Sequence, residues 1–146
     1  MQAFFGQKEH QKRMSNMRRK NLSSGTSWEK SVGYSRAVRV ANTIEVSGTV
    51  SITNSGEIVG ANDPFLQTRF ILMRIQNAIE QLGGELKDVV RTRIYVKDIE
   101  QWDKIGKAHS EFFGETLPCT TMIEVSRMIQ EAYLVEIEAT AILNHD

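Results

Sequence analysis

The chain has 146 residues, 40% of them hydrophobic, and its 18 Lys and Arg side chains balance 18 Asp and Glu side chains. This size suits a single domain with a substantial core. The only cysteine, Cys119, has no second cysteine for an internal disulfide or a shared thiolate metal site. Since no apolar stretch approaches the roughly 20 residues that span a bilayer, we expect a cytoplasmic protein.

The N-terminus is basic, although the whole chain is neutral. Residues 1–20 carry six Lys and Arg side chains, and Glu9 is their only acidic side chain. We predict that residues 1–30 form a basic arm and a polar linker, and that residues 31–146 form the domain. The arm is expected to be a frayed, solvated terminus; the alternative is contact with RNA or an anionic surface through counterion release.

Two strands and a helix are predicted next. Residues 36–51 are rich in Val, Ile and Thr and are interrupted at "ANT", which predicts two strands with a tight connection. Asp63 as N-cap, Pro64 at the first helical position and Gly83-Gly84 after the end predict a helix between them. The apolar stripe of this helix comprises Leu72, Ile75, Ile79 and Leu82, with Phe65, Ile71 and Ala78 beside it.

The stretch "DVVRTRIYVKD" alternates with period two, which predicts a strand with one buried face. We assign Val90, Thr92, Ile94 and Val96 to that face, and Arg91, Arg93 and Tyr95 to the other. A second helix is predicted from about Asp98 to Phe113, with an apolar stripe made by Trp102, Ile105, His109 and Phe112. No second histidine or cysteine stands at ligand spacing, so His109 is interpreted as a packed side chain.

The segments "CTTMIEVS" and "YLVEIEATAIL" predict two final strands. In the last one, alternation places Val135, Ile137, Ala139, Ala141 and Leu143 on one face. The order β-β-α-β-α-β-β predicts an α+β fold with two helices on one face of a mixed sheet.

Charged and apolar side chains are expected together on the opposite sheet face: Arg91 and Arg93, Met122 and Glu124, Glu136 and Glu138. This mixture suits a sheet face that is covered by another copy of the chain, so we predict a homo-oligomer. The alternative is that this face is simply exposed to solvent.

Four stretches together resemble one family: "YSRAVRVANTIEVSG", "IQNAIEQLGGELKDVVRTRIYVKDI", "HSEFFGETLPCTTMIEV" and "LVEIEATA". In order and spacing they are similar to the reactive intermediate deaminase superfamily, also called RidA/YjgF or endoribonuclease L-PSP-like proteins, over residues 32–142. The resemblance implies a chorismate-mutase-like fold and a homotrimer with a small-molecule cleft between subunits. It also implies hydrolysis of 2-imino or 2-aminoacrylate acids to 2-keto acids and ammonia, without a metal or an organic cofactor.

The resemblance carries site residues over to this sequence. Tyr34 corresponds to the tyrosine that borders the cleft, and Gly48 to the strand glycine whose backbone faces the ligand. Glu136 corresponds to the carboxylate that positions the water. All three residue types are present here.

The stretch "LPCTTMIEV" departs from the family pattern. Thr120 stands where active deaminases have the arginine that grips the substrate carboxylate, and Met122 stands where they have a cysteine. Both remain candidate ligand-binding residues. Cys119 occupies a position that is commonly alanine, so we interpret it as a small packing residue. Compensating charge could come from Arg36, Arg91 or Arg93.

Three hypotheses follow. The chain hydrolyses imine or enamine metabolites, with Glu136 positioning water and with doubtful activity on 2-aminoacrylate. Alternatively it binds a metabolite, or serves as a scaffold, without chemistry. The third hypothesis is an endoribonuclease that uses the basic arm. The sequence gives it little support, because it contains no paired histidines and no aromatic RNA platform.

Overall fold

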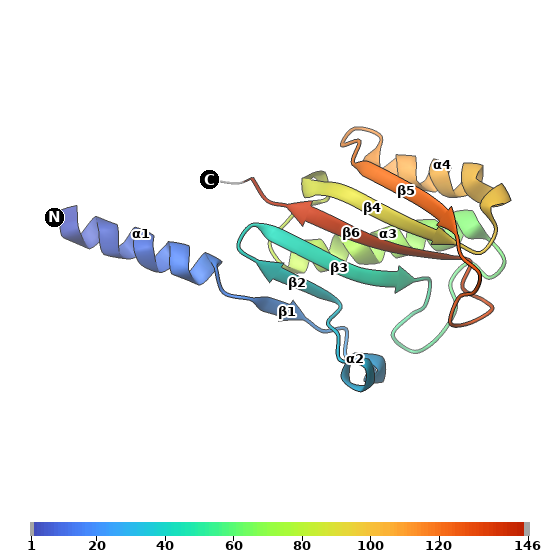
Figure 1. Ribbon diagram of the computed structural model, residues 1–146, viewed down its shortest axis with the longest axis horizontal. Coiled ribbons are helices and arrows are strands. Elements are labelled where there is room, and N and C mark those ends of the chain that lie inside the picture. Colours follow the sequence, from blue (N-terminus) through green and yellow to red (C-terminus); the bar gives the residue numbers. More distant parts are fainter. Residues whose placement is uncertain (1, 145–146) are drawn as a thin grey trace.

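The computed structural model describes residues 2–144 and confirms the predicted α+β fold, in which α3 and α4 cover one face of a mixed six-stranded sheet (Figure 1). The helices are α1 (Gln2–Asn16), α2 (Ser27–Val32), α3 (Pro64–Gln81) and α4 (Trp102–Phe113), with 3-10 turns η1 (Leu86–Asp88) and η2 (Ile99–Gln101). The strands are β1 (Lys20–Leu22), β2 (Ala37–Val40), β3 (Thr43–Val50), β4 (Val89–Val96), β5 (Cys119–Glu124) and β6 (Val135–Ile142).

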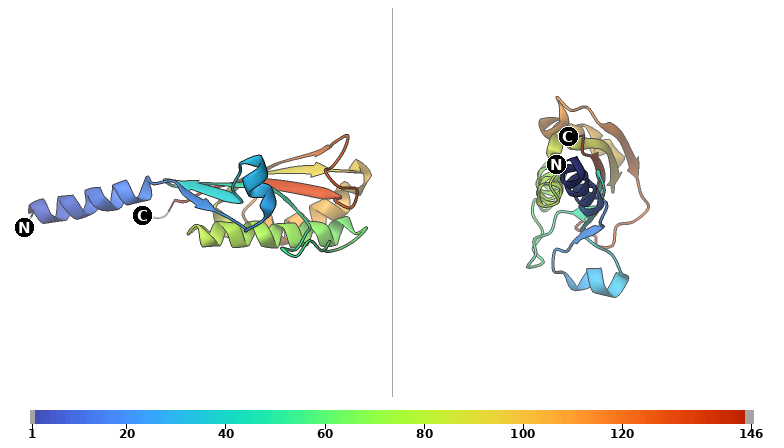
Figure 2. Two further views of the ribbon diagram at one scale, coloured as in Figure 1. Left: turned by 90° about the horizontal axis from the view of Figure 1, so that it is seen from below. Right: turned by 90° about the vertical axis from the view of Figure 1, so that its left-hand side faces the viewer.

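The strands lie in the order β1-β2-β3-β6-β4-β5. Only β4 and β5 pair in parallel, and the other neighbours are antiparallel. The predicted inward face of β6 is confirmed, since all five of its assigned residues are buried. They pack against the α3 stripe, whose buried members include Leu72, Ile75 and Ile79. Figure 2 shows α3 on one side of the sheet and α2 on the other.

The signals that predict α3 are confirmed at both ends of the helix. The Leu66 N–H donates to Asp63 Oδ1 at 3.0 Å, and Pro64 is the first helical residue. After the helix, Gly83 takes a φ of 86°, in the left-handed region that glycine adopts without strain. Local chemistry therefore determines where this helix begins and ends.

Gly84 is required by packing. A Cβ at this position would lie 2.8 Å from Ile79 Cγ2 and 3.0 Å from Ile44 Cδ1. We expect Gly84→Ala to lower the free energy of unfolding by about 1 to 2 kcal/mol, because the core must move aside. Gly106 in α4 has open space around its Cα, so the control Gly106→Ala should raise the free energy of unfolding by up to about 1 kcal/mol. Urea titration measures the free energy of unfolding of both variants. Equal changes in Gly84→Ala and Gly106→Ala would contradict the packing argument.

The assignment of Val90 to the buried face of β4 is wrong. Val89 is buried instead, and Val90 is 40% exposed. The cause is a register shift between Val89 and Arg91 in the β4–β6 ladder, which changes the alternation at the start of the strand.

Trp102 does not join the apolar stripe of α4, since its side chain is 62% exposed. Ile99, in the preceding 3-10 turn, packs against the core at this end of the helix. Ile105, Ala108 and Phe113 are the buried residues of α4. The stripe prediction was therefore wrong at its first residue, because a change from 3-10 to α geometry alters the angular spacing of side chains.

The assignment of Met122 and Glu124 to the open sheet face is also wrong. In the parallel β4–β5 pair, Met122 lies beside Ile94 and Glu124 beside Val96, and both partners are buried on the helix side. Glu124 Oε2 accepts from the Ile99 N–H at 3.0 Å, which agrees with that side. A period-two pattern defines two faces, but only pairing with a neighbour decides which one is inside.

The stretch predicted as a polar linker contains regular structure. β1 pairs with β2, and α2 follows it. The basic N-terminus includes the helix α1, which projects away from the sheet (Figure 1). The domain boundary at residue 31 stays a prediction. Among residues 2–144, no helix combines the length and the apolarity that crossing a membrane requires.

Candidate functional site

Gly48 and Glu136 meet where β3 pairs irregularly with β6, between Val46 and Thr49. A Cβ at position 48 would lie 2.2 Å from Glu136 Oε1, so the carboxyl occupies space that any other residue would fill. Two residues predicted for the site are therefore in direct contact. Glycine is needed here for close approach rather than for an unusual backbone angle.

Arg36 adds a cation to this contact, which the sequence suggested only as one of three alternatives. Its Nη2 donates to the Gly48 carbonyl at 2.6 Å. Its Nε is buried and has no hydrogen-bond partner among residues 2–144. Arg36 and Glu136 thus flank the same glycine, and the guanidinium stabilises the charged form of the carboxyl.

Burial raises the pKa of Glu136 above its usual value; Arg36 opposes this shift, and Glu138 adds to it. The pKa of the Tyr133 phenol is also raised, first by burial and then by the Glu136 charge. A carboxyl with a raised pKa exchanges protons closer to neutral pH than an exposed glutamate does. Such a group suits general acid–base chemistry.

Tyr34 is held near Arg36 by α2 and the loop before it. The buried Glu29 accepts hydrogen bonds from Ser23 Oγ at 2.5 Å and from Ser24 Oγ at 2.6 Å. The Tyr34 N–H donates to the Glu29 carbonyl at 3.0 Å. Glu29 thus anchors the segment that carries Tyr34, whose side chain is 38% exposed.

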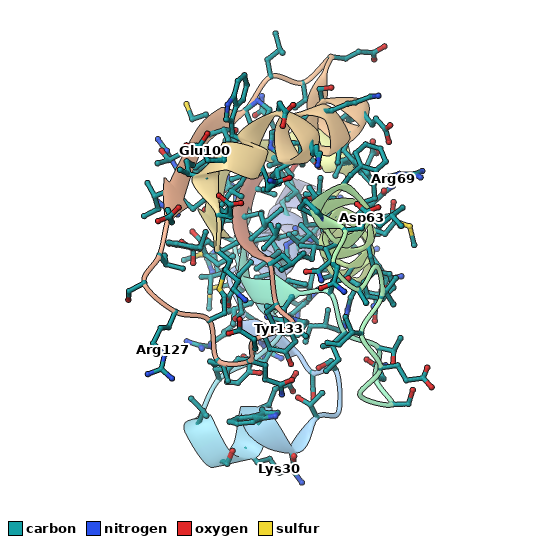
Figure 3. All side chains as sticks on the ribbon, turned by 90° about the vertical axis from the view of Figure 1, so that its right-hand side faces the viewer. Lys30, Asp63, Arg69, Glu100, Arg127 and Tyr133 are labelled. Carbon is teal, nitrogen blue, oxygen red and sulfur yellow. The ribbon has the colours of Figure 1, made fainter. Side chains whose placement is uncertain are left out.

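The segment between β5 and β6 borders the same side of the sheet. Figure 3 looks along the sheet: Arg127, in this segment, lies on the side away from α3, which carries Arg69, and α2 with Lys30 lies below. Figure 2 likewise places α2 and this segment on the side away from α3. Together they border the open face near one end of the sheet.

Thr120 lies in a second group, apart from Glu136. Thr92 Oγ1 is 2.9 Å from Thr120 Oγ1 and 2.9 Å from His109 Nε2. Thr120 is beside Thr92, which pairs with Ala139, whereas Glu136 pairs with Tyr95. The Cα atoms of Thr120 and Glu136 are therefore two strand spacings and three residues apart in the sheet, a distance of roughly 14 Å. Within one chain, the predicted site residues therefore divide into two groups.

The other residues near Thr120 differ in their surroundings. Met122 is half-buried and packs against the core. Cys119 is exposed, so its interpretation as a packing residue is wrong for the single chain. It lies on β5, the last strand in the order of the sheet. His109 packs its ring against Phe113, with centroids 4.7 Å apart, and burial lowers its pKa, which favours the neutral imidazole.

Sequence reasoning did not single out the Thr92–His109 contact or the role of Glu29. Thr92 and His109 both lie at inward positions of amphipathic elements, and a polar residue at such a position is the signal that could have found them. Among residues 2–144, no three His, Cys, Asp or Glu side chains are close enough to hold a metal ion.

Comparison with known proteins gives consistent matches. The model of the family described as Endoribonuclease L-PSP matches residues 25–143. A RutC family protein of Pyrococcus abyssi is 39% identical over 109 residues, which cover 74% of this chain and 84% of that protein. The 3-aminoacrylate deaminase RutC of Acinetobacter baylyi is 30% identical over 108 residues, covering 74% and 85%.

A solved structure is also similar to this one. The crystal structure of Rv2704 from Mycobacterium tuberculosis, a member of the YjgF/YER057c/UK114 family, has a TM-score of 0.78 and 44% identity. The match covers 86% of this chain and all of that chain. The sequence and the fold thus point to the same family.

Proposed function

Because this chain belongs to the RidA/YjgF superfamily, matched here as Endoribonuclease L-PSP, we propose that it hydrolyses imine or enamine metabolites in clefts between the subunits of a homotrimer. The observation that carries the proposal is the half-buried Glu136 carboxyl seated on Gly48. The relative from Acinetobacter baylyi is named a 3-aminoacrylate deaminase, and 3-aminoacrylate is an enamine acid.

The proposed reaction needs only water and proton transfer. An enamine takes up a proton on carbon to become an iminium ion, whose carbon is electrophilic. The Glu136 carboxylate accepts a proton from the attacking water, and the new C–O bond forms as the C=N π electrons move to nitrogen. Glu136 then returns the proton to nitrogen. The C–N bond breaks and ammonia leaves as an oxygen lone pair forms the C=O bond, and the hydroxyl proton passes to water, so that a carbonyl compound remains.

Assembly would bring the two groups of site residues together. We propose that the Glu136 group of one subunit and the Thr120 group of its neighbour border each cleft. Two features of the open face support an interface: Tyr95 donates to Glu138 Oε1 at 2.9 Å, and Arg93 lies 3.7 Å from the same oxygen. A partly exposed ion pair such as Arg93–Glu138 stabilises a single chain little, but it gives an interface a defined charge pattern.

Thr120 limits the substrate class that we propose. Its hydroxyl is bonded to Thr92 Oγ1 and carries no charge. An arginine fork makes charge-assisted hydrogen bonds worth about 1.5 to 3 kcal/mol each, so its absence weakens the hold on a carboxylate. Imines without a free carboxylate at that position are therefore the preferred substrates.

An ammonia-release assay tests this function. The wild-type protein is expected to release ammonia from imines that lack a carboxylate faster than from freshly generated 2-aminoacrylate. Thr120→Arg should raise the rate on 2-aminoacrylate tenfold or more, because it restores a cation where the carboxylate would bind. Sedimentation measures the trimer independently. A wild-type protein that releases no ammonia above buffer from any imine would overturn the proposal.

Binding without catalysis is the second candidate. It is favoured by the neutral Thr120, which stands in place of the arginine while Gly48 and Glu136 are in contact. In that case a metabolite would raise the Tm of the protein without any release of ammonia, and this stabilisation would depend on Tyr34. Ammonia release and thermal stabilisation can be measured on the same protein preparations, and together they distinguish catalysis from binding alone.

A further inference from the structure

A polar pocket of about 470 Å³ lies between the end of β1, the loop after β3 and α3. This volume is within the usual range for small-molecule sites. The pocket is lined by Leu22, Ser23, Ser24, Arg36, Asn54, Met73, Arg74, Asn77, Ala78 and Gln81. Arg74, Asn77, Ala78 and Gln81 follow helical spacing, so α3 presents one continuous face to it. Glu136 is not among the lining residues.

Two guanidinium groups share this pocket without a carboxylate between them. Among residues 2–144, neither Arg36 nor Arg74 forms an ion pair within 4.0 Å. Arg74 donates to the Ile52 carbonyl and, at 3.2 Å, to Asn54 Oδ1. Burial lowers the pKa of both arginines; at Arg36 the Arg74 charge lowers the pKa further, whereas the Glu29 and Glu136 charges oppose the shift. Two like charges thus line a partly buried space whose other lining residues are neutral, and both of these carboxylates lie outside the lining.

We propose that this pocket binds the phosphate group of a small metabolite. A dianion would offset both guanidinium charges and could accept several of their N–H groups at once. The Asn77 and Gln81 amides supply further donors, which suit a hydroxylated portion of the ligand; the Ser23 and Ser24 hydroxyls line the pocket but already donate to Glu29. Met73, Ala78 and Leu22 provide apolar contact. The pocket shares Arg36 with the Glu136 group, but phosphate binding in it does not require hydrolysis by Glu136.

A charge change inside the pocket is the sharpest test. Asn77→Asp has nearly the same shape and still accepts the hydrogen bond that Gln81 Nε2 donates to Asn77 Oδ1, but it adds a negative charge beside both arginines. Asn144→Asp makes the same change at an exposed position outside the pocket. Both variants keep the basic N-terminus, so phosphate held there contributes equally to each.

The full-length protein is titrated with inorganic phosphate at constant ionic strength, by calorimetry and by thermal unfolding. We expect saturable binding and a higher Tm for wild type and Asn144→Asp, and affinity at least tenfold weaker for Asn77→Asp. As a second pair, Arg74→Gln should weaken binding, whereas Arg69→Gln, which removes an exposed arginine paired with Glu111, should not.

Malonate, titrated in the same way, distinguishes a carboxylate site from a phosphate site. Saturable binding of malonate but not of phosphate would overturn the phosphate assignment. Equal phosphate affinity in Asn77→Asp and Asn144→Asp, or no saturable binding of either anion, would overturn the pocket itself. None of these readouts uses ammonia release, so failure here is distinguishable from failure of the proposed hydrolysis.

Discussion

Glu136→Gln is expected to lower imine hydrolysis by about 100- to 10,000-fold, the usual contribution of a positioned general acid or base. Glutamine keeps the shape of the side chain on Gly48 but cannot accept a proton from water. Ammonia release under substrate saturation measures the loss. Glu111→Gln is the control: it makes the same change in an exposed side chain of α4 that pairs with Arg69, and it should retain most of the activity.

The same variant gives a pH readout that does not depend on substrate. Since burial raises the pKa of Glu136 in the folded protein, the folded state holds this proton more tightly than the unfolded state does. Wild type should therefore lose stability relative to Glu136→Gln as pH rises from the unfolded value, near 4.5, through the raised pKa. If the wild-type carboxylate is the base, activity rises with pH through that pKa. Parallel stability curves for the two proteins would contradict a raised pKa.

Gln67→Leu is expected to lower the free energy of unfolding by about 2 to 3 kcal/mol. Two hydrogen bonds are lost, and the two backbone groups that Gln67 binds are left without their side-chain partner. Gln67 is fully buried in α3. Its Nε2 donates to the Ala132 carbonyl at 2.9 Å, and its Oε1 accepts from the Leu134 N–H at 3.0 Å. This amide thus fixes the end of the segment that leads into β6. Chemical denaturation measures the change.

Gln76→Leu is the control for Gln67→Leu. Gln76 lies on the same helix, and its side chain hydrogen-bonds to the exposed Glu80, so we expect an effect within about 0.5 kcal/mol. Gln67→Leu should also lower any activity of Glu136, since Tyr133 and the start of β6 would lose their anchor. Equal stability of the two variants would show that Gln67 does not hold this segment.

Local sequence chemistry determined the elements of this fold. Asp63, Pro64 and Gly83 predict the limits of α3, because caps and glycine act within a few residues of themselves. Alternation in β6 predicts its buried face correctly. In β4 the same reasoning fails at Val90, because a register shift depends on the neighbouring strand.

The candidate site was only partly accessible from the sequence. Family resemblance selected Gly48 and Glu136, and tertiary structure alone decided that the Glu136 carboxyl fills the space above Gly48 while Arg36 bonds the carbonyl of that glycine. Strand pairing likewise decided that Thr120 meets Thr92 rather than Glu136. Caps and periodicity act over a few residues, whereas contacts between distant strands depend on how the whole sheet is paired. That is why the sequence by itself predicted the elements and the family, and the tertiary structure decided which charges meet.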